Sequence, residues 1–155
     1  MKDIIHSLKY EHRRSIAPPL GRLMRERGAE LLRDANVVVP VPLHPRREYQ
    51  RGFNQADDIA RELGVPVVPL LKRVVFTKSQ IELPKEARRE NVKDAFTLSH
   101  PCGDKPLGLS IRIVVLVDDV STTGATLEAC ARVLKASGVK EVRALTAARV
   151  VNDRR

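Results

Sequence analysis

The stretch that decides the fold is Val114-Val115-Leu116-Val117-Asp118-Asp119-Val120-Ser121-Thr122-Thr123-Gly124-Ala125-Thr126. Its first four residues are apolar and predict a buried parallel strand. Two carboxylates, Asp118 and Asp119, stand at the carboxyl end of that strand, and a helical pattern begins at Gly124. The amino end of a helix offers unpaired N–H groups and the positive end of a dipole, which together attract phosphate. The stretch therefore predicts an anion site on a strand–turn–helix unit.

The turn is also rich in hydroxyl groups, which come from Ser121, Thr122, Thr123 and Thr126. Gly124 lets the backbone approach a ligand closely, and the two carboxylates can accept hydrogen bonds from sugar hydroxyls. One turn can thus hold both ends of a ribose 5-phosphate. The alternative is that these polar residues only cap the next helix, for which one polar side chain is enough. This turn supplies six polar side chains.

Three other motifs fit this stretch less well. A P-loop ends in Gly-Lys-Ser/Thr after a Gly-rich turn, and the chain has no such run. The dinucleotide fingerprint G-x-G-x-x-G is absent too. A response-regulator receiver carries paired aspartates near its start, with most of the sheet still to come. Here only one helical pattern and one strand pattern follow the pair.

The rest of the chain alternates between helical patterns and strand patterns. Helices are expected over residues 3–10, 18–34, 50–63 and 124–137, and strands over 37–41, 65–71, 92–98, 111–117 and 141–150. In the helix over 18–34 we expect one inward face that carries Leu20, Leu23, Leu31 and Leu32. A long loop is expected over 72–90, which is charged and has no clean period. This alternation predicts an α/β fold with a mostly parallel central sheet flanked by helices.

Composition limits the class of protein. With 155 residues, 43% of them apolar, the chain fits one domain with a real core. We expect an N-terminal helical segment over 1–35 and the core over 36–155. The net charge of +9 favours anionic partners, either a polyphosphate ligand or nucleic acid. Cys102 and Cys130 lie far apart and suggest neither a disulfide framework nor a zinc site, and Cys130 is expected in the core. No apolar run is long enough to span a bilayer, so a cytoplasmic location is expected.

The stretch from Val114 to Thr126 resembles the phosphoribosyl pyrophosphate (PRPP) motif of type I phosphoribosyltransferases, in which a hydrophobic strand, two acidic residues and a Thr/Gly-rich phosphate loop follow one another. A second stretch resembles the competence protein F family, a branch of those enzymes: Pro40-Val41-Pro42-Leu43-His44-Pro45-Arg46-Arg47, followed by Arg51-Gly52-Phe53-Asn54-Gln55. The likeness continues at Arg73, Thr77, Gln80, Leu83, Arg88, Arg89, Asn91 and Phe96, so that it covers most of residues 36–150.

The resemblance implies a role for each part of the site. Asp118 and Asp119 would act at the ribose, and the 5-phosphate would be bound by Val120, Ser121, Thr122, Thr123, Gly124, Ala125 and Thr126. The pyrophosphate loop would comprise Val41, Pro42, Leu43 and His44. Positive charge nearby would come from Arg46, Arg47 and Arg51, because arginine presents a fork of donors suited to phosphate oxygens. For Arg46, Arg47 and His44 an ordinary solvated surface position stays open.

The loop over 72–90 resembles the flexible catalytic loop of the same enzymes, which closes over the pyrophosphate and shields a reactive ribose centre from water. In it, Lys78, Arg88 and Arg89 would neutralise the leaving pyrophosphate, and Arg88 and Arg89 join Asp118 and Asp119 as expected catalytic residues. A plain charged surface loop is the alternative. Mg²⁺ is expected as cofactor, bound through PRPP and water with Asp118 and Asp119 nearby and without a protein cage.

Two functions follow from the resemblance. The first is transfer of a phosphoribosyl group from PRPP to an unidentified nitrogen acceptor, with release of pyrophosphate. The second is a non-catalytic or regulatory module in DNA uptake that binds single-stranded DNA or proteins of the competence machinery. The candidates for DNA contact are Arg13, Arg14, Arg22, Arg25 and Arg27. Residues 1–35 would have to supply the hood that selects the acceptor, and a homodimer stays open.

Overall fold

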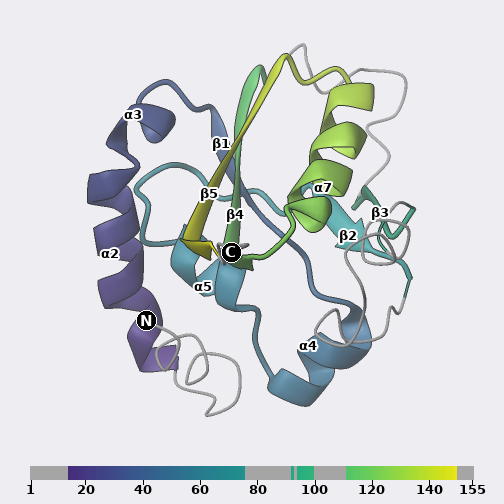
Figure 1. Cartoon of the computed structure of the whole chain (residues 1–155), viewed down its shortest axis with the longest axis horizontal. Helices are drawn as coiled ribbons and strands as arrows, with labels where there is room; N and C mark the ends of the chain where they lie inside the picture. The colour runs from purple at the N-terminus through teal and green to yellow at the C-terminus, as the bar shows by residue number, and fades with distance from the viewer. Residues whose placement is uncertain (1–13, 76–91, 93, 100–110, 150–155) are drawn as a thin grey trace, which may run out of the picture.

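A three-stranded parallel sheet runs through the middle of the computed structural model, which describes residues 14–75, 92, 94–99 and 111–149 (Figure 1). Strand β4 (Ile113–Ser121) lies between β1 (Val37–Pro40) and β5 (Glu141–Arg149). The apolar run from Val114 to Val117 is fully buried at its centre, as the sequence predicts for a parallel strand covered on both faces. The expected α/β fold with a parallel sheet is confirmed.

Helices cover both faces of this sheet. Side chains alternate along β4, so Val114 and Leu116 pack toward helix α7 (Ala125–Ala136), while Val115 and Val117 face the opposite side. That opposite side carries α2 (Ala17–Arg27) and α5 (Gln55–Ala60). In Figure 1, α2 and α7 accordingly lie on opposite sides of the strands.

The N-terminal helix packs by a different face from the one expected. A short 3-10 turn (Arg14–Ile16) leads into α2, which ends before Gly28, and α3 (Ala29–Leu32) follows. The inward positions of α2 are Ala17, Gly21 and Met24. The four leucines expected on one face are divided, because Leu32 and the partly buried Leu20 pack into the core, whereas Leu23 and Leu31 are 49% and 37% exposed. Gly21 is small because α2 crosses very close to α5 and the turn after it: a Cβ on Gly21 would lie 2.4 Å from Cβ of Glu62 and 3.1 Å from the carbonyl oxygen of Ile59.

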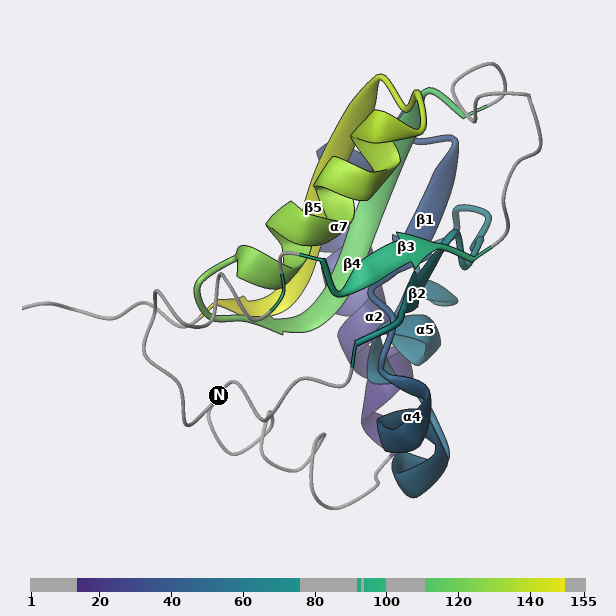
Figure 2. The same ribbon diagram turned by 90° about the vertical axis from the view of Figure 1, so that its right-hand side faces the viewer.

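The single helix expected over 50–63 is two helices, α4 (Pro45–Arg51) and α5. Gly52 ends α4 in the left-handed region, with φ of +76°, and its N–H donates to the carbonyl of Glu48 at 2.7 Å. Asn54 then begins α5, since its Oδ1 accepts from the N–H of Ala56 at 3.1 Å. The break places α4 at the lower end of the molecule in Figure 2, beyond the sheet.

A small antiparallel hairpin replaces two other expected elements. Strand β2 (Leu71–Arg73) pairs with β3 (Phe96–Leu98), and the figures show the pair beside α7 (Figures 1 and 2). The strand expected over 65–71 is wrong for most of its length, because Pro66 and Pro69 cannot donate to a ladder. Only an isolated parallel bridge joins Val67 to Val38. Lys72 and Arg73, which were expected to begin a loop over 72–90, belong to β2, and residues 76–90 of that expected loop lie outside the described residues.

The other expected boundaries differ by a few residues. The strand expected over 111–117 continues to Ser121, and α7 and β5 lie within one residue of the ranges expected for them. The strand expected over 92–98 is limited to β3. The helix expected over 3–10 lies outside the described residues. Within the part of the chain that the structure describes, no helix has both the length and the apolarity to cross a bilayer.

Candidate functional site

The two motifs singled out from the sequence meet at one edge of the sheet. Because β1 and β4 are parallel and Pro40 lies opposite Val117, their carboxyl ends lie side by side. The N–H of Val41 donates to the carbonyl of Val117 at 2.9 Å. The predicted pyrophosphate loop is thus hydrogen-bonded to the residue that precedes Asp118. This edge is where open α/β sheets bind ligands.

Both carboxylates lie within strand β4, at its exit. Oδ1 of Asp118 accepts from the N–H of Asp119 at 2.9 Å, and Oδ1 of Asp119 accepts from the N–H of Val120 at 2.7 Å. Each bond uses one of the roughly four acceptor positions of a carboxylate. Both side chains are partly exposed. The bonds orient the carboxylates while leaving acceptor capacity for hydroxyl groups of a ligand.

The residues from Ser121 to Gly124 lead from the end of β4 into α7. Gly124 precedes α7 with φ of +77°, and Oγ1 of Thr123 accepts from the N–H of Ala125 at 3.3 Å. A hollow of about 20 Å³ lies in this turn, and its lining consists of Asp118, Val120, Ser121, Thr122, Thr123, Gly124, Ala125, Thr126 and Leu127. A space of that size admits one water-sized group. A phosphate oxygen has this size, and the hollow lies at the amino end of α7.

The predicted pyrophosphate loop is held at both ends. His44 begins α4, since its Nδ1 accepts from the N–H of Arg46 at 3.2 Å. Desolvation in the turn, with the charges of Arg46, Arg73 and Arg47, lowers the pKa of His44, so that its imidazole is neutral at pH 7. At the other end, Nδ2 of Asn54 donates to the carbonyl of Val41 at 3.1 Å.

The predicted arginines of α4 differ in their surroundings. A guanidinium nitrogen of Arg51 donates to Oε1 of Gln55 at 3.2 Å, which links α4 to α5. Arg47 is half-buried and close enough to influence His44 and Arg73 electrostatically, whereas Arg46 is exposed. Arg46 also acts on the pKa of His44, and Arg47 is the one of the three that acts on the pKa of Arg73 as well.

Arg73 is a site residue to which the sequence analysis gave no role. It is 7% exposed, and its guanidinium lies 5.3 Å from the ring centre of Phe96, its partner across the β2–β3 ladder. Burial and Arg47 lower its pKa, while Cys130 and Asp118 act in the opposite direction. The feature of the sequence that could have indicated its burial is the alternation along the strand, in which Leu71 and Arg73 share one face and the exposed Lys72 lies on the other. That pattern is too short to indicate a strand without its partner.

The remaining candidates divide into three groups. Cys130 is in the core, as expected, and burial raises the pKa of its thiol to about 12, so it stays protonated at neutral pH. Lys78, Arg88 and Arg89 lie outside the described residues. Among the described residues, no group of three or more His, Cys, Asp or Glu side chains is placed to hold a metal ion.

Comparison with known proteins agrees with this geometry. The family model described as "Phosphoribosyl transferase domain" matches residues 49–155. The chain is 34% identical over 149 residues to Competence protein F from Haemophilus influenzae, covering 90% of this chain and 63% of that protein. It is 33% identical over 155 residues to DNA utilization protein YhgH from Escherichia coli K12, covering 92% and 64%. The chain thus spans less than two thirds of these relatives.

One solved structure shows the same fold at low identity. Hypoxanthine phosphoribosyltransferase from Trypanosoma cruzi aligns with a TM-score of 0.50 and 11% identity, over 90% of this chain and 79% of that one. The resemblance to competence protein F that the sequence indicated is confirmed. Because the family model covers more than half of the chain, this protein belongs to the phosphoribosyl transferase domain family.

Proposed function

We propose that this protein binds PRPP and transfers its phosphoribosyl group to a nitrogen acceptor. The observation that carries the proposal is the hydroxyl-lined hollow at the start of α7, which lies beside two carboxylates and the loop that begins at Val41. A ligand that spans this edge needs a phosphate at one end and ribose hydroxyls next to it. PRPP meets both requirements and carries a pyrophosphate for the neighbouring loop.

The reaction balances without a further co-reactant. The bond between C1 of the ribose and the pyrophosphate oxygen breaks, a bond from the acceptor nitrogen to C1 forms, and the acceptor nitrogen loses a proton to solvent or product. Thr123 and Thr126 would hold the 5-phosphate, and Asp118 and Asp119 would hold the ribose hydroxyls and offset positive charge at C1. Catalysis would then come from positioning and electrostatic stabilisation.

Mg²⁺ fits this donor set. As a hard cation it prefers oxygen ligands and keeps several waters, so two partly exposed carboxylates suit an ion that arrives with PRPP. When bound, it would neutralise charge on the leaving pyrophosphate. Asp118 and Asp119 are the residues that would hold it.

The decisive experiment replaces both carboxylates. In the double variant Asp118→Asn with Asp119→Asn, the loss of charge-assisted hydrogen bonds should weaken PRPP binding by about 1.5–3 kcal/mol for each bond lost. Titration calorimetry with PRPP and Mg²⁺ measures this affinity. Asp94→Asn, an exposed change outside the site, is the matched control and should leave the affinity unchanged. Equal affinity in the double variant and the wild type would contradict the assignment.

Turnover needs its own assay. Purines, pyrimidines and amines are offered in turn, and pyrophosphate release from PRPP is recorded. We expect release with one acceptor class, and we expect the double variant to abolish it. PRPP binding without release for any acceptor would favour a binding module over an enzyme.

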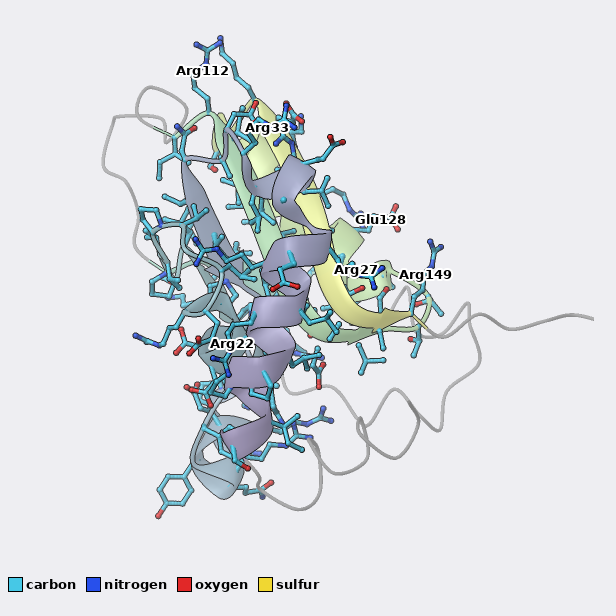
Figure 3. All side chains as sticks on the ribbon, turned by 90° about the vertical axis from the view of Figure 1, so that its left-hand side faces the viewer. Arg22, Arg27, Arg33, Arg112, Glu128 and Arg149 are labelled. Atoms are coloured by element: carbon cyan, nitrogen blue, oxygen red, sulfur yellow. The ribbon has the colours of Figure 1, made fainter. Side chains whose placement is uncertain are left out.

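A second candidate function is binding of single-stranded DNA, which a groove beside α2 favours. The groove measures about 540 Å³, and three arginines line it, Arg22, Arg25 and Arg33, against one carboxylate, Glu26. The Arg25 guanidinium packs against the backbone of Gly64, where a Cβ would lie 2.8 Å from its Cζ. Figure 3 shows Arg22 and Arg33 projecting from this side of the molecule.

This candidate uses the expected N-terminal arginines only in part. Arg27 is exposed on α2 but does not line the groove, and Arg13 lies outside the described residues. Arg33, which the sequence analysis did not include, replaces them. Several guanidinium groups along one groove suit a phosphodiester backbone. The names of two relatives, a competence protein and a DNA utilization protein, support the same candidate.

A further inference from the structure

Strand β5 has one open edge. It pairs with β4 on one side, and no described element pairs with it on the other. Figure 1 shows this outer edge turned toward the viewer between α2 and α7, and Figure 2 shows it at the left of the sheet. None of the nine residues of β5 is buried, whereas the run from Val114 to Val117 of β4 is fully buried. The described part of the chain therefore covers this long strand only in part.

The register of the sheet shows which backbone groups of β5 reach the open edge. The N–H of Glu141 donates to the carbonyl of Arg112 at 2.9 Å, so Glu141 directs its backbone groups toward β4. These groups alternate in direction along a strand. The residues whose N–H and C=O groups are directed outward are therefore Val142, Ala144, Thr146 and Ala148. A row of such groups is a template for pairing with another strand.

The middle of β5 lacks the features that usually protect an exposed edge. Proteins commonly place lysine, proline or a bulge on such a strand. The run from Ala144 to Ala148 has no charged residue and no proline, and its register with β4 continues without a bulge. The charged residues of β5 lie nearer its ends, at Glu141, Arg143 and Arg149. The uncharged middle thus permits the close approach of another strand.

We propose that the outer edge of β5 pairs with β5 of a second copy of this chain, antiparallel and about a two-fold axis at Leu145. This register uses the full length of the strand, because Leu145 is its midpoint. It places Val142 opposite Ala148 and Ala144 opposite Thr146, so the outward backbone groups of one copy meet those of the other. The contact is self-complementary and closes as a dimer.

The charges of β5 are complementary in this register. Glu141 lies opposite Arg149 of the second copy, and the two-fold axis repeats this pair at the other end of the contact. Arg143 lies opposite Ala147, so like charges do not face each other directly. Glu141 contacts Arg143 of its own strand at 2.7 Å, but its side chain stays 52% exposed and has acceptor capacity for a second guanidinium.

The neighbouring two-fold registers fit less well. An axis at Thr146 would place Arg143 opposite Arg149, and like charges directly opposite each other destabilise a sheet. An axis at Ala144 would remove the pairing between Glu141 and Arg149 and shorten the contact. The charge pattern therefore favours the axis at the midpoint of the strand.

Sedimentation velocity of the whole chain over a range of concentrations tests this pairing, and we expect a monomer–dimer equilibrium. Ala144→Pro removes an outward N–H and leaves the ladder with β4 in place, since proline is tolerated where the N–H faces away from the sheet. It should raise the dissociation constant of the dimer about tenfold or more, because the two-fold axis repeats the lost hydrogen bond. Ala144→Ser keeps the N–H and is the matched control, with a dissociation constant close to that of the wild type.

Charge reversal tests the register. Glu141→Arg and Arg149→Glu should each raise the dissociation constant about tenfold, because each creates a like-charge contact twice in the dimer. The double variant Glu141→Arg/Arg149→Glu places opposite charges across the contact again and should recover most of the affinity. Glu128→Arg, an exposed change on α7, is the control for the same change in net charge and should leave the dimer intact.

A monomer at every concentration would overturn the proposal. So would a dimer that Ala144→Pro and both single reversals leave intact, because another surface would then join the copies. If Ala144→Pro does not fold, the reversal series decides: recovery in the double variant supports the pairing, and weakening without recovery overturns it.

The pairing and the proposed function can fail independently. Because the paired strands are antiparallel, the proposed PRPP sites of the two copies would lie at opposite ends of one continuous sheet. Folded Ala144→Pro should therefore bind PRPP as tightly as the wild type. Failure of the wild type to bind PRPP would refute the proposed function and leave the dimer unaffected.

Discussion

Thr123 and Thr126 carry the hydroxyl groups nearest the start of α7, and their contributions can be separated. Oγ1 of Thr123 accepts from the N–H of Ala125, so this hydroxyl also caps the helix. Thr126 lies in the first turn of α7 and lines the hollow. In the proposed site, Thr123 would therefore serve both stability and ligand binding, and Thr126 would serve ligand binding.

We expect Thr123→Val and Thr126→Val each to lower PRPP affinity, since each removes a hydroxyl donor. Thr123→Val should in addition lower the free energy of unfolding by about 1 kcal/mol, because the cap is lost. Calorimetry measures the affinity and urea unfolding the stability. Thr97→Val on β3 is the control for exchanging a hydroxyl for a methyl group, and PRPP affinity should not respond to it. Full PRPP affinity in the Thr123→Val/Thr126→Val double variant would rule out this turn as the phosphate site.

Sequence could predict the residues whose role depends on near neighbours in the chain. Gly52 ends α4 in the left-handed region and Asn54 caps α5, and both roles depend on residues only a few positions away in the chain. Asp118 directly follows the apolar run from Val114 to Val117, although β4 itself continues to Ser121. Arg73 could not be assigned a role in this way, because its burial depends on Phe96 from a strand that pairs with β2 only in the folded chain.

At the scale of elements, the helices and strands predicted correctly are those whose pattern is local, and the errors arise where contacts between distant segments decide the structure. Of the long runs with a clear period, α7 was predicted to within one residue at each end, whereas β4 was predicted as a strand but continues four residues beyond its expected end. The helix expected over 50–63 is divided by Gly52, since a left-handed residue ends α4 whatever pattern continues beyond it. In α2 the leucine pattern was misleading, because the contact with α5 depends on how closely the two helices approach rather than on apolarity alone.

The close approach of α2 and α5 gives a prediction for Gly21. Gly21→Ala places a methyl group 2.4 Å from Cβ of Glu62, an atom that moves only with the backbone. We expect the free energy of unfolding to fall by about 1–3 kcal/mol, as for other overpacked contacts. Leu23→Ala, on the exposed face of the same helix, should change it by much less. Denaturant unfolding compares the two, and a Gly21→Ala variant as stable as the wild type would show that α2 can move aside.

Another prediction concerns the link between α3 and β5. The guanidinium of Arg143 donates to Asp34, to Glu141 at 2.7 Å and to the carbonyl of Leu31 at 2.8 Å. The hydrogen bond from Arg143 is the main cause that lowers the pKa of Asp34 below its ordinary value of 3.8. The folded state therefore favours the ionised carboxylate, and this contribution to stability is complete above pH 3.8 and is lost as the pH falls through the lowered value.

Asp34→Asn should accordingly lower Tm at pH 7, and the difference from the wild type should shrink as the pH falls below 3.8. Thermal unfolding at a series of pH values measures both effects. Glu128→Gln, an exposed change on α7, controls for the loss of one negative charge (Figure 3). A Tm difference that stays constant into acid would show that Asp34 acts through packing or polarity and not through its charge.

At the scale of the whole molecule, the two candidate functions use different regions. The proposed PRPP site lies at the carboxyl ends of β1 and β4, whereas the groove beside α2 is lined by residues that precede β1 and by the turn around Gly64. Leu63, Gly64 and Val65 follow α5, and Leu32 and Arg33 lead toward the start of β1. These segments belong to the amino-terminal end of the sheet. Variants at one region should therefore leave the other intact, which allows the two functions to be tested separately.

The salt dependence of DNA binding tests the groove. Affinity for a fluorescent oligothymidine, measured by anisotropy at rising salt, should fall on a logarithmic plot with a slope set by the number of phosphate contacts. Replacing Arg22, Arg25 and Arg33 with Ala should reduce that slope by about 2, since each contact to a single strand accounts for about 0.7. PRPP affinity should not change. The matched control removes three cations elsewhere, Arg112, Arg132 and Lys140, and should leave most of the slope in place because it lowers only the net charge.

Equal effects of the two triple variants would mean that net charge and not the groove attracts DNA. Absence of DNA binding even at low salt would remove the second candidate, and loss of both ligands in the groove variant would indicate one shared anion site.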